Sequence, residues 1–288
     1  MPKRNYDMTQ KKYHRLRKVG RGKGVGSKYK SFLTGFDFSS IGNTHRFMSW
    51  LLKRRVNLFS DNEYAWFCYL EQLPSVIDIR EQFPLTPPNE ILNIVAQCDH
   101  KYYTRLRNRE LTDGLIYVPT IDFLVTMKKH GHVFDVAFTV KPAEKLTRHQ
   151  VLKFEIERRY LQRRGIGFFI ITDTLLKQKC PNLFKNIDFL RPFRNIDDYP
   201  KYQNLNPNLR DDVIQYLTKT LLGKNLVLRN ITDESDQKFR IEDGTSLLLA
   251  NHCIANQNWR IDMLKPYNPT QPVTLIETTN VFDNPQNK

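Results

Sequence analysis

The sequence lacks long apolar runs and is poor in cysteine. None of its apolar stretches approaches the roughly 18 consecutive residues that a membrane-spanning helix needs, and no apolar segment follows the positive charges at the N-terminus. The four cysteines, Cys68, Cys98, Cys180 and Cys253, are scattered without C-x-x-C spacing. We therefore expect no membrane span, no secretory signal and no zinc site, and we expect a protein of the reducing cytoplasm.

Acidic residues are also scarce relative to basic ones. Asp and Glu together number 30 against 45 Lys and Arg, which gives a formal net charge of +15. The imbalance is strongest in residues 1–30, where Asp7 is the single acid. This basic N-terminal arm is either a solvated tail or a phosphate-binding segment. The charge of the whole chain predicts an anionic partner, for which nucleic acid is the simplest choice.

Alternating glycines within the arm favour the phosphate-binding interpretation. Gly20, Gly22, Gly24 and Gly26 would let backbone amides approach a DNA backbone closely. A nucleotide-binding loop is not expected, because no apolar strand precedes these glycines. From the charge in this arm and in the segment that follows it, we expect four DNA-binding residues: Arg21, Lys23, His45 and Arg46.

Residues 118–140 predict a β-hairpin. Two runs rich in β-branched and aromatic residues, 118–125 and 133–140, flank a polar stretch with turn chemistry. In an antiparallel pair closed at this turn, Asp122 lies within a residue of Val140 and Lys141. A carboxylate beside a lysine in this position is either a salt bridge at the end of a sheet or part of a functional site.

The wider pattern favours a site. An acid at the start of one strand and a polar-x-Lys triplet on the next, here Thr139 to Lys141, form the layout of the PD-(D/E)xK nuclease core. In that core, carboxylates hold a divalent cation against the scissile phosphate, and the lysine orients or deprotonates the attacking water. The chemistry needs a second acid. Glu63 supplies one at the start of a helix whose capping box runs from Ser60 to Glu63, although Glu63 could equally serve as a helix cap alone.

Six segments, in order and at compatible spacing, resemble the TnsA family, the endonuclease subunit of heteromeric (Tn7-like) cut-and-paste transposases. The resemblance covers residues 15–173. The segments that carry it are residues 20–26, 60–63, 76–85, 122–125, 140–143 and 157–160.

The resemblance implies a catalytic triad of Glu63, Asp122 and Lys141, with Glu157 as a supporting acid. The implied cofactor is Mg²⁺, for which Mn²⁺ would substitute. The metal ligands would be Glu63, Asp122 and the backbone carbonyl of Val140. The family tends to carry glutamine where this chain has Thr139, so the Thr139 hydroxyl is a further candidate ligand for the metal or for water bound to it.

The remaining pattern of residues 1–173 predicts an α/β domain. A strand over 76–84, a helix over 147–164 and an apolar strand over 166–171 surround the hairpin. We therefore expect a restriction-endonuclease-like PD-(D/E)xK core within residues 1–173. Residues 86–117 have the least regular pattern, and their basic, tyrosine-containing stretch 101–109 suits either DNA contact or an exposed face.

The composition changes after Asp173. Helices near 209–222 and 246–256 and a strand near 259–264 predict a smaller winged-helix-like α+β domain over residues 174–270. Residues 271–288 are polar and predict a tail. The resemblance implies that this half of the chain engages an ATPase regulator.

The function implied is that of a metal-dependent DNA endonuclease that cuts the 5′ ends of a transposon. Its partners would be double-stranded DNA at the transposon ends, a DDE-type transposase subunit and the ATPase regulator, in the cytoplasm of a bacterium and at the nucleoid when active. Two alternatives remain open. One is a basic adaptor that binds DNA ends without cutting them, and the other is a stand-alone restriction or repair nuclease built on the same core.

Overall fold

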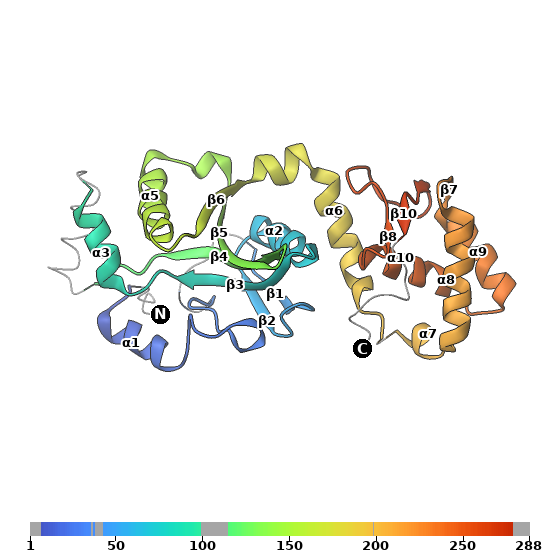
Figure 1. The fold of residues 1–288 in the computed structure, drawn as a ribbon, viewed down its shortest axis with the longest axis horizontal. Helices are drawn as coiled ribbons and strands as arrows, with labels where there is room; N and C mark the ends of the chain where they lie inside the picture. The colour runs from blue at the N-terminus through green and yellow to red at the C-terminus, as the bar shows by residue number, and fades with distance from the viewer. Residues whose placement is uncertain (1–6, 36, 38–42, 99–114, 198, 279–288) are drawn as a thin grey trace, which may run out of the picture. The chain divides into compact units, whose positions relative to one another are not determined.

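The computed structural model describes residues 7–35, 37, 43–98, 115–197 and 199–278. The chain divides into two compact units, Met1–Lys179 and Cys180–Lys288, which are described separately (Figure 1). The first unit ends six residues after the boundary expected at 173. Among the described residues, no helix has the length and apolar character needed to cross a membrane.

A four-stranded mixed sheet forms the centre of the first unit. Its strand order is β3-β4-β5-β6, with β3, β4 and β5 antiparallel and β5 and β6 parallel. A separate antiparallel pair is formed by β1 and β2. This mixed α/β architecture confirms the predicted class. The strands are β1 (His45–Met48), β2 (Arg55–Leu58), β3 (Val76–Pro84), β4 (Thr120–Lys129), β5 (His132–Lys141) and β6 (Gly167–Thr172).

The predicted hairpin is confirmed as β4 and β5. Lys129 faces His132 across a two-residue turn, one residue from the predicted register. The turn residues His130 and Gly131 have φ angles of 50° and 80°. Positive φ at both central residues is what a tight hairpin turn requires, because it matches the twist of the flanking strands.

Helices cover both faces of this sheet. Leu124 of β4 belongs to one core cluster with Ile156 of α5. Its neighbour Phe123 contacts Phe67 of α2, with ring centroids 6.1 Å apart. Because adjacent residues of a strand point to opposite faces, α5 and α2 lie on opposite sides. The helices of this unit are α1 (Gln10–Lys18), α2 (Asp61–Gln72), α3 (Pro88–Ala96) and α5 (Arg148–Gln162), with shorter turns η1 (Gly26–Lys28), η2 (Ala143–Lys145) and η3 (Thr174–Lys179).

Part of the segment 86–117 is more regular than predicted. Pro88 begins helix α3, whose side chains Ile91, Ile94 and Val95 are buried. Pro87 precedes this helix and Pro88 starts it, because proline fits the first helical position, where no N–H is needed. The basic stretch 101–109 lies outside the described residues.

The N-terminal segment packs against β3 rather than forming a solvated tail over its described part. A Cβ atom at Gly22 would lie 2.4 Å from Cγ of Pro84. The backbone N–H of Gly26 donates to Asp78 Oδ1 at 3.1 Å. Here the close approach that glycine permits is made to the chain's own strand.

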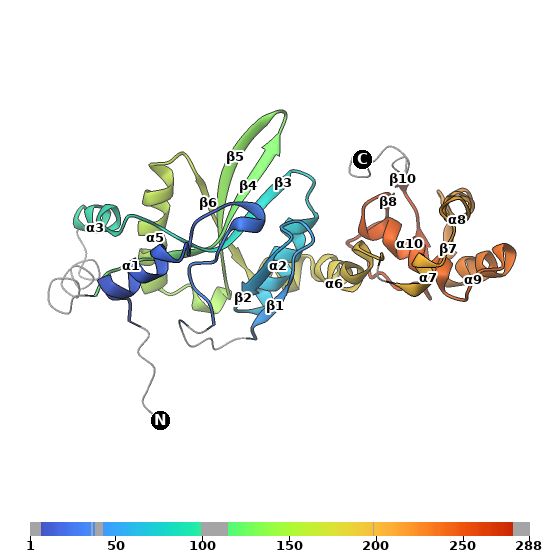
Figure 2. The ribbon, with the colours of Figure 1, turned by 90° about the horizontal axis from the view of Figure 1, so that it is seen from below.

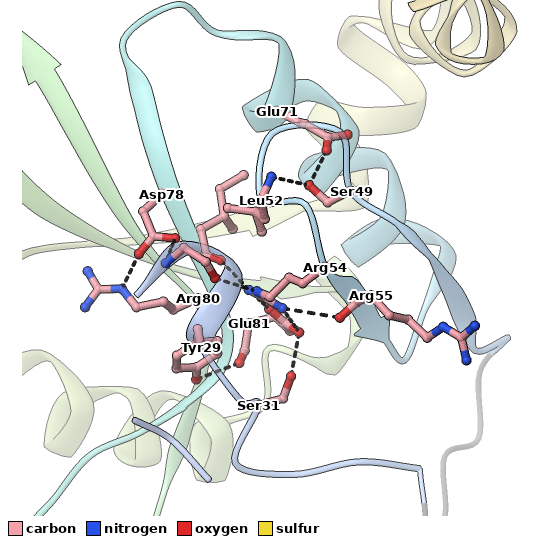
Figure 3. Close-up of polar contacts among 12 residues, drawn as sticks. Tyr29, Ser31, Ser49, Leu52, Arg54, Arg55, Glu71, Asp78, Arg80 and Glu81 are labelled. Atoms are coloured by element: carbon pink, nitrogen blue, oxygen red, sulfur yellow. Dashed lines mark hydrogen bonds and ion pairs between the residues drawn. The ribbon is translucent and has the colours of Figure 1, made fainter. Parts of the chain in front are cut away.

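A buried ion pair ties this segment and β2 to β3 (Figure 3). Nη1 and Nη2 of Arg54 lie 2.8 and 2.6 Å from the two carboxylate oxygens of Glu81. Ser31 donates a further hydrogen bond to Glu81, and Tyr29 donates one to the Glu81 carbonyl. Both charges are desolvated, so a full set of partners is what makes their burial tolerable.

The second unit is a helical cluster with short strand pairs (Figures 1 and 2). Leu217 of α8, Leu228 of α9 and Leu249 of α10 share one buried core. The helices predicted near 209–222 and 246–256 are confirmed, whereas α6 and α9 were not predicted. The elements are α6 (Pro181–Leu190), η4 (Arg191–Arg194), α7 (Pro200–Gln203), α8 (Pro207–Leu221), α9 (Leu228–Phe239), α10 (Thr245–Ala255), β7 (Asn225–Val227), β8 (Trp259–Arg260), β9 (Pro272–Thr274) and β10 (Glu277–Thr278).

The predicted tail over 271–288 is wrong for its first residues. β9 pairs antiparallel with β7, and β10 pairs antiparallel with β8. These strands are short and largely exposed, so their residues are polar like those of a disordered tail. Composition alone therefore could not distinguish these strands from a tail. Residues 279–288 lie outside the described part of the chain. The strand expected over 259–264 is limited to β8.

Candidate active site

One cavity of about 200 Å³ collects the predicted site residues of the first unit. Helix α2 contributes its first turn, β4 and β5 contribute their ends away from the hairpin turn, and α5 contributes its middle. Five predicted residues line the cavity: Glu63, Asp122, Thr139, Lys141 and Glu157. Residues separated by almost a hundred positions in the sequence therefore meet around one small space.

Asp122 lies where the sheet opens. The residue-by-residue pairing between β4 and β5 ends at Phe123 opposite Phe138. Beyond it, Oδ2 of Asp122 accepts hydrogen bonds from Thr139 Oγ1 at 2.9 Å and from the backbone N–H of Val140 at 2.7 Å. The carboxylate thus replaces a backbone partner at this point.

Lys141 completes the contacts of this carboxylate, as the hairpin register predicted. Its Nζ lies 2.9 Å from Asp122 Oδ2. Burial alone would lower the pKa of Lys141, but the charges of Asp122 and Glu63 outweigh it and raise the pKa above its usual value. Lys141 is therefore positively charged at neutral pH.

Glu63 is both a helix cap and a cavity residue. Ser60 is the N-cap of α2, and its hydroxyl accepts from the backbone N–H of Glu63. The Glu63 carboxylate accepts from the backbone N–H of Phe59 at 3.0 Å. Burial and the nearby charge of Asp122 raise the pKa of Glu63 to about 7. The capping and site interpretations of Glu63 are thus compatible.

Glu157 is a buried carboxylate with few partners. It is 1% exposed, and neither of its oxygens accepts a hydrogen bond from a described residue. The nearest cation is Lys153, whose Nζ is 3.8 Å from Oε1. Burial raises the pKa of Glu157 to about 7. A buried acid without donors is expensive, so the site has a capacity for positive charge that the protein itself does not fill.

The donor set fits a hard divalent cation held by few protein ligands. Within the described residues, no three His, Cys, Asp or Glu side chains gather into a ready-made metal cage. Glu63 and Asp122 supply two carboxylates at one cavity. Mg²⁺ is typically bound by one or two carboxylates together with water and substrate phosphate, so such a pair suits it better than it suits zinc. The Thr139 hydroxyl faces Asp122, and the Val140 carbonyl stays a predicted ligand.

Sequence reasoning missed two lining residues whose side chains carry N–H donors. Gln82 of β3 and Lys153 of α5 also line the cavity. Lys153 sits one helical turn before Glu157, so helical spacing could have identified it. Gln82 carried no signal, because its backbone conformation departs from that of the strand it belongs to.

The predicted DNA-binding residues do not line this cavity in the described part of the chain. Arg21 is ion-paired with Asp37 and lines a second cavity of about 390 Å³. Nε2 of His45 is hydrogen-bonded to Oδ1 of Asp61 at 2.7 Å, at the start of α2. Lys23 and Arg46 are exposed. The second cavity is bordered by basic side chains, which are Arg21, Lys30, Arg54 and Arg55.

Comparison with known proteins gives two family matches and one relative. Residues 73–173 match the TnsA-like endonuclease N-terminal model, and residues 181–263 match the TnsA endonuclease C-terminal model. The transposition protein TnsA of transposon Tn7 from Escherichia coli is 38% identical over 191 residues. That alignment covers 66% of this chain and 66% of the relative, so the match spans just under two thirds of the relative's length. The first family match includes Asp122, Lys141 and Glu157 and begins after Glu63.

Proposed function

The chain belongs to the TnsA endonuclease family, and on that premise we propose that it is the endonuclease subunit of a transposase. It hydrolyses phosphodiester bonds at the 5′ ends of a transposon during cut-and-paste transposition, with Mg²⁺ as cofactor. The observation that carries the proposal is the single cavity lined by Glu63, Asp122 and Lys141. Such a group of acids and a lysine has no evident structural need to meet in one place.

The fold supports a PD-(D/E)xK assignment. The mixed sheet places an acid on β4 and a lysine on the adjacent β5, while α2 brings a second acid from one end. This is the layout required to hold a cation beside a phosphate and a water. For the second unit, the five α-helices and two short strand pairs of its described residues support the proposal of a winged-helix-like partner-binding domain.

Each residue of the cavity has a proposed role. A bound Mg²⁺ would supply charge stabilisation at the phosphate and lower the pKa of the attacking water. Glu63 and Asp122 would hold the cation. Lys141, being protonated, positions the water and stabilises developing negative charge, rather than removing a proton. Glu157 adds negative charge behind the ligands and can take up a proton near neutral pH.

The test is cleavage of duplex DNA carrying the transposon ends, with the partner transposase subunit and Mg²⁺ present. Lys141→Ala should bind the DNA and assemble like the wild type while losing 5′ strand cleavage. Lys145→Ala is a matched control, because Lys145 is an exposed lysine four residues away on η2. A Lys141→Ala protein that still cuts would contradict the assignment of the site.

Two alternatives predict different results in the same assay. A basic adaptor would bind the transposon-end DNA, but neither the wild type nor any variant would cut it when metal is added. A stand-alone restriction or repair nuclease would cut without the partner subunit. The charge of +15 supports DNA binding under all three hypotheses, so cleavage and not binding separates them.

The partners are proposals of the same kind. We expect the first unit to act beside a DDE-type transposase subunit and the second unit to engage an ATPase regulator, in the bacterial cytoplasm and at the nucleoid when the complex is active. Co-purification of the full chain with each partner, compared with a chain ending at Lys179, measures which unit carries each contact. Retention of the regulator by the shortened chain would contradict the assignment of the second unit.

A further inference from the structure

Gln82 has a backbone conformation that its neighbours in β3 do not share. Its φ angle is 49°, in the left-handed region that residues with a Cβ rarely adopt. The residue is 4% exposed and lies within a nine-residue strand. Pairing between β3 and β4 includes Glu81 opposite Phe123 and Phe83 opposite Ile121, and omits the position between them. That position places Gln82 opposite Asp122.

Contacts on the preceding residue hold this conformation. Nη1 and Nη2 of Arg54 both donate hydrogen bonds to the carboxylate of Glu81 (Figure 3). The backbone carbonyl oxygen of Glu81 accepts a hydrogen bond from the Tyr29 hydroxyl at 3.0 Å. The Glu81 carbonyl belongs to the peptide group that joins it to Gln82. Unfavourable backbone conformations persist where surrounding contacts determine them, and they concentrate at functional sites.

The result of this conformation is that a carboxamide lines the cavity. Gln82 lines it together with Asp122 and Thr139, residues of three neighbouring strands. Oε1 of Gln82 accepts from Thr120 Oγ1 at 3.4 Å. Its Nε2 donates to no acceptor among the described residues, and it is not one of their buried polar atoms without a partner. Because Gln82 lines the cavity, this donor is available to a ligand that accepts a hydrogen bond from it.

The other donors at this cavity are already engaged with carboxylates. Lys141 Nζ and Thr139 Oγ1 both contact Asp122. Lys153 is nearest to Glu157. A phosphate entering beside three carboxylates needs a donor that is not neutralised by them. Gln82 supplies one without adding charge.

We propose that Gln82 is a substrate-binding residue whose Nε2 donates a hydrogen bond to a non-bridging oxygen of the phosphodiester that is cut. The proposal rests on the proposed function, since it names the contact that positions the substrate in the same cavity. The strained backbone serves to direct the carboxamide towards that oxygen, opposite Asp122.

The sharpest variant is Gln82→Gly. Glycine adopts positive φ readily, so this change keeps the backbone conformation and removes the whole side chain, including the carboxamide. We expect the thermal midpoint to stay the same or rise, while kcat/KM for cleavage falls by roughly 10- to 100-fold, the usual range for a hydrogen bond to a charged group. Gln82→Asn, which also tolerates this conformation, should lie between the two proteins.

A binding measurement separates contact with the phosphate from a structural role. Affinity for transposon-end duplex is measured without divalent metal, so that no cutting occurs, using normal DNA and DNA with a methylphosphonate at the cut position. Each methylphosphonate diastereomer lacks one non-bridging oxygen. Gln82→Gly should bind normal DNA about tenfold more weakly than the wild-type protein does. For one methylphosphonate diastereomer, the variant and the wild-type protein should bind with equal affinity. An equal loss on all DNAs, or no loss on any, overturns the proposal.

Gln82→Glu tests the rival role of a metal ligand. A carboxylate at this position would repel phosphate and abolish the gain from Nε2, but it would bind a cation as well as the amide oxygen or better. Cleavage by Gln82→Glu at or above the wild-type rate would therefore overturn the proposal. Failure of this proposal can be told apart from failure of the proposed function. If the wild type cuts DNA and Lys141→Ala does not, the nuclease assignment stands, even if Gln82→Gly cuts like the wild type.

Discussion

The backbone N–H of Val140 donates a 2.7 Å hydrogen bond to Oδ2 of Asp122, beyond the last residue pair of the β4–β5 ladder. The carboxylate therefore joins two strands that the backbone no longer joins. The same oxygen also accepts from Lys141. Stability of the open end of the hairpin and geometry of the candidate site thus depend on one side chain.

We predict that Asp122→Asn lowers the free energy of unfolding by about 1–3 kcal/mol in the absence of metal. The neutral amide oxygen is a weaker acceptor, and the Lys141 charge is left without its nearest counter-charge. Urea denaturation of the full chain measures the change. Asp233→Asn, at an exposed acid of the second unit, is the control and should change stability by less than about 0.5 kcal/mol. Equal stability of both variants would contradict the prediction.

Added metal should stabilise the wild type and not its carboxylate variants. Mg²⁺ or Mn²⁺ at about 100 times its Kd should add about 2.7 kcal/mol, seen as a higher thermal midpoint. Glu63→Gln is informative because its amide oxygen can still accept from Phe59, so the helix cap persists while the charge is lost. A metal-dependent rise that survives in both Asp122→Asn and Glu63→Gln would place the ion elsewhere.

Glu157 predicts a pH dependence of stability in the metal-free protein. Its folded pKa of about 7 lies above the usual value of 4.5, so between these values the folded state binds more protons than the unfolded state. Stability must then fall as pH rises through this window, by at most about 3 kcal/mol. The free energy of unfolding of Glu157→Gln, minus that of the wild type, should therefore increase as the pH rises from 4.5 to 7. Above pH 7 this difference should stay constant.

Glu155→Gln is the matched control for that experiment. Glu155 lies on the same helix, but hydrogen bonds from Arg158 and Arg159 lower its pKa to about 2. The ionised Glu155 carboxylate therefore contributes its full stabilisation at every pH above the usual glutamate pKa. That stabilisation is lost only as the pH falls below the usual pKa. Denaturation from pH 5 to 8 should give a constant difference for this variant. A constant difference for Glu157→Gln as well would contradict the buried-charge interpretation.

The elements whose signals are local were predictable from the sequence. The hairpin followed from two β-rich runs around a turn, and its register then placed Asp122 beside Lys141. The capping box at Ser60 located the first turn of α2, and with it Glu63. Three site residues were therefore placed by turn and cap chemistry, which depend on only a few neighbouring residues.

The features that depend on distant contacts were not predictable in the same way. Gln82 lies in an ordinary strand sequence, and its positive φ arises beside a residue held by Arg54 and Tyr29. β9 and β10 are two or three residues long and exist through pairing with strands more than 15 residues earlier. No local pattern encodes such partners, because the pairing energy comes from outside the segment.

Arg54 provides a test of the buried network beside Gln82. Arg54→Met should destabilise the protein by about 3–5 kcal/mol, because it leaves the Glu81 carboxylate buried and unpaired. The double variant Arg54→Met/Glu81→Leu should recover most of that loss. Arg260→Met breaks a pair with Glu277 in which both side chains are more than half exposed, and it should cost less than about 1 kcal/mol. A double variant no more stable than Arg54→Met would show that hydrogen bonds, and not the unpaired charge, dominate.

The glycine spacing of the N-terminal segment has a structural interpretation that one matched pair of variants can test. Gly22 and Gly131 have φ angles of 66° and 80°, so alanine at either position meets a left-handed backbone penalty of about 1–2 kcal/mol. Only Gly22 has a close neighbour, since its Cβ would lie 2.4 Å from Pro84, whereas nothing lies within 4 Å at Gly131. Gly22→Ala should therefore lose a further 1–3 kcal/mol, roughly the cost of overpacking, in urea denaturation. Equal losses would mean that the segment moves away from β3 freely, and the glycines would then be better explained by close approach to DNA than by packing against Pro84.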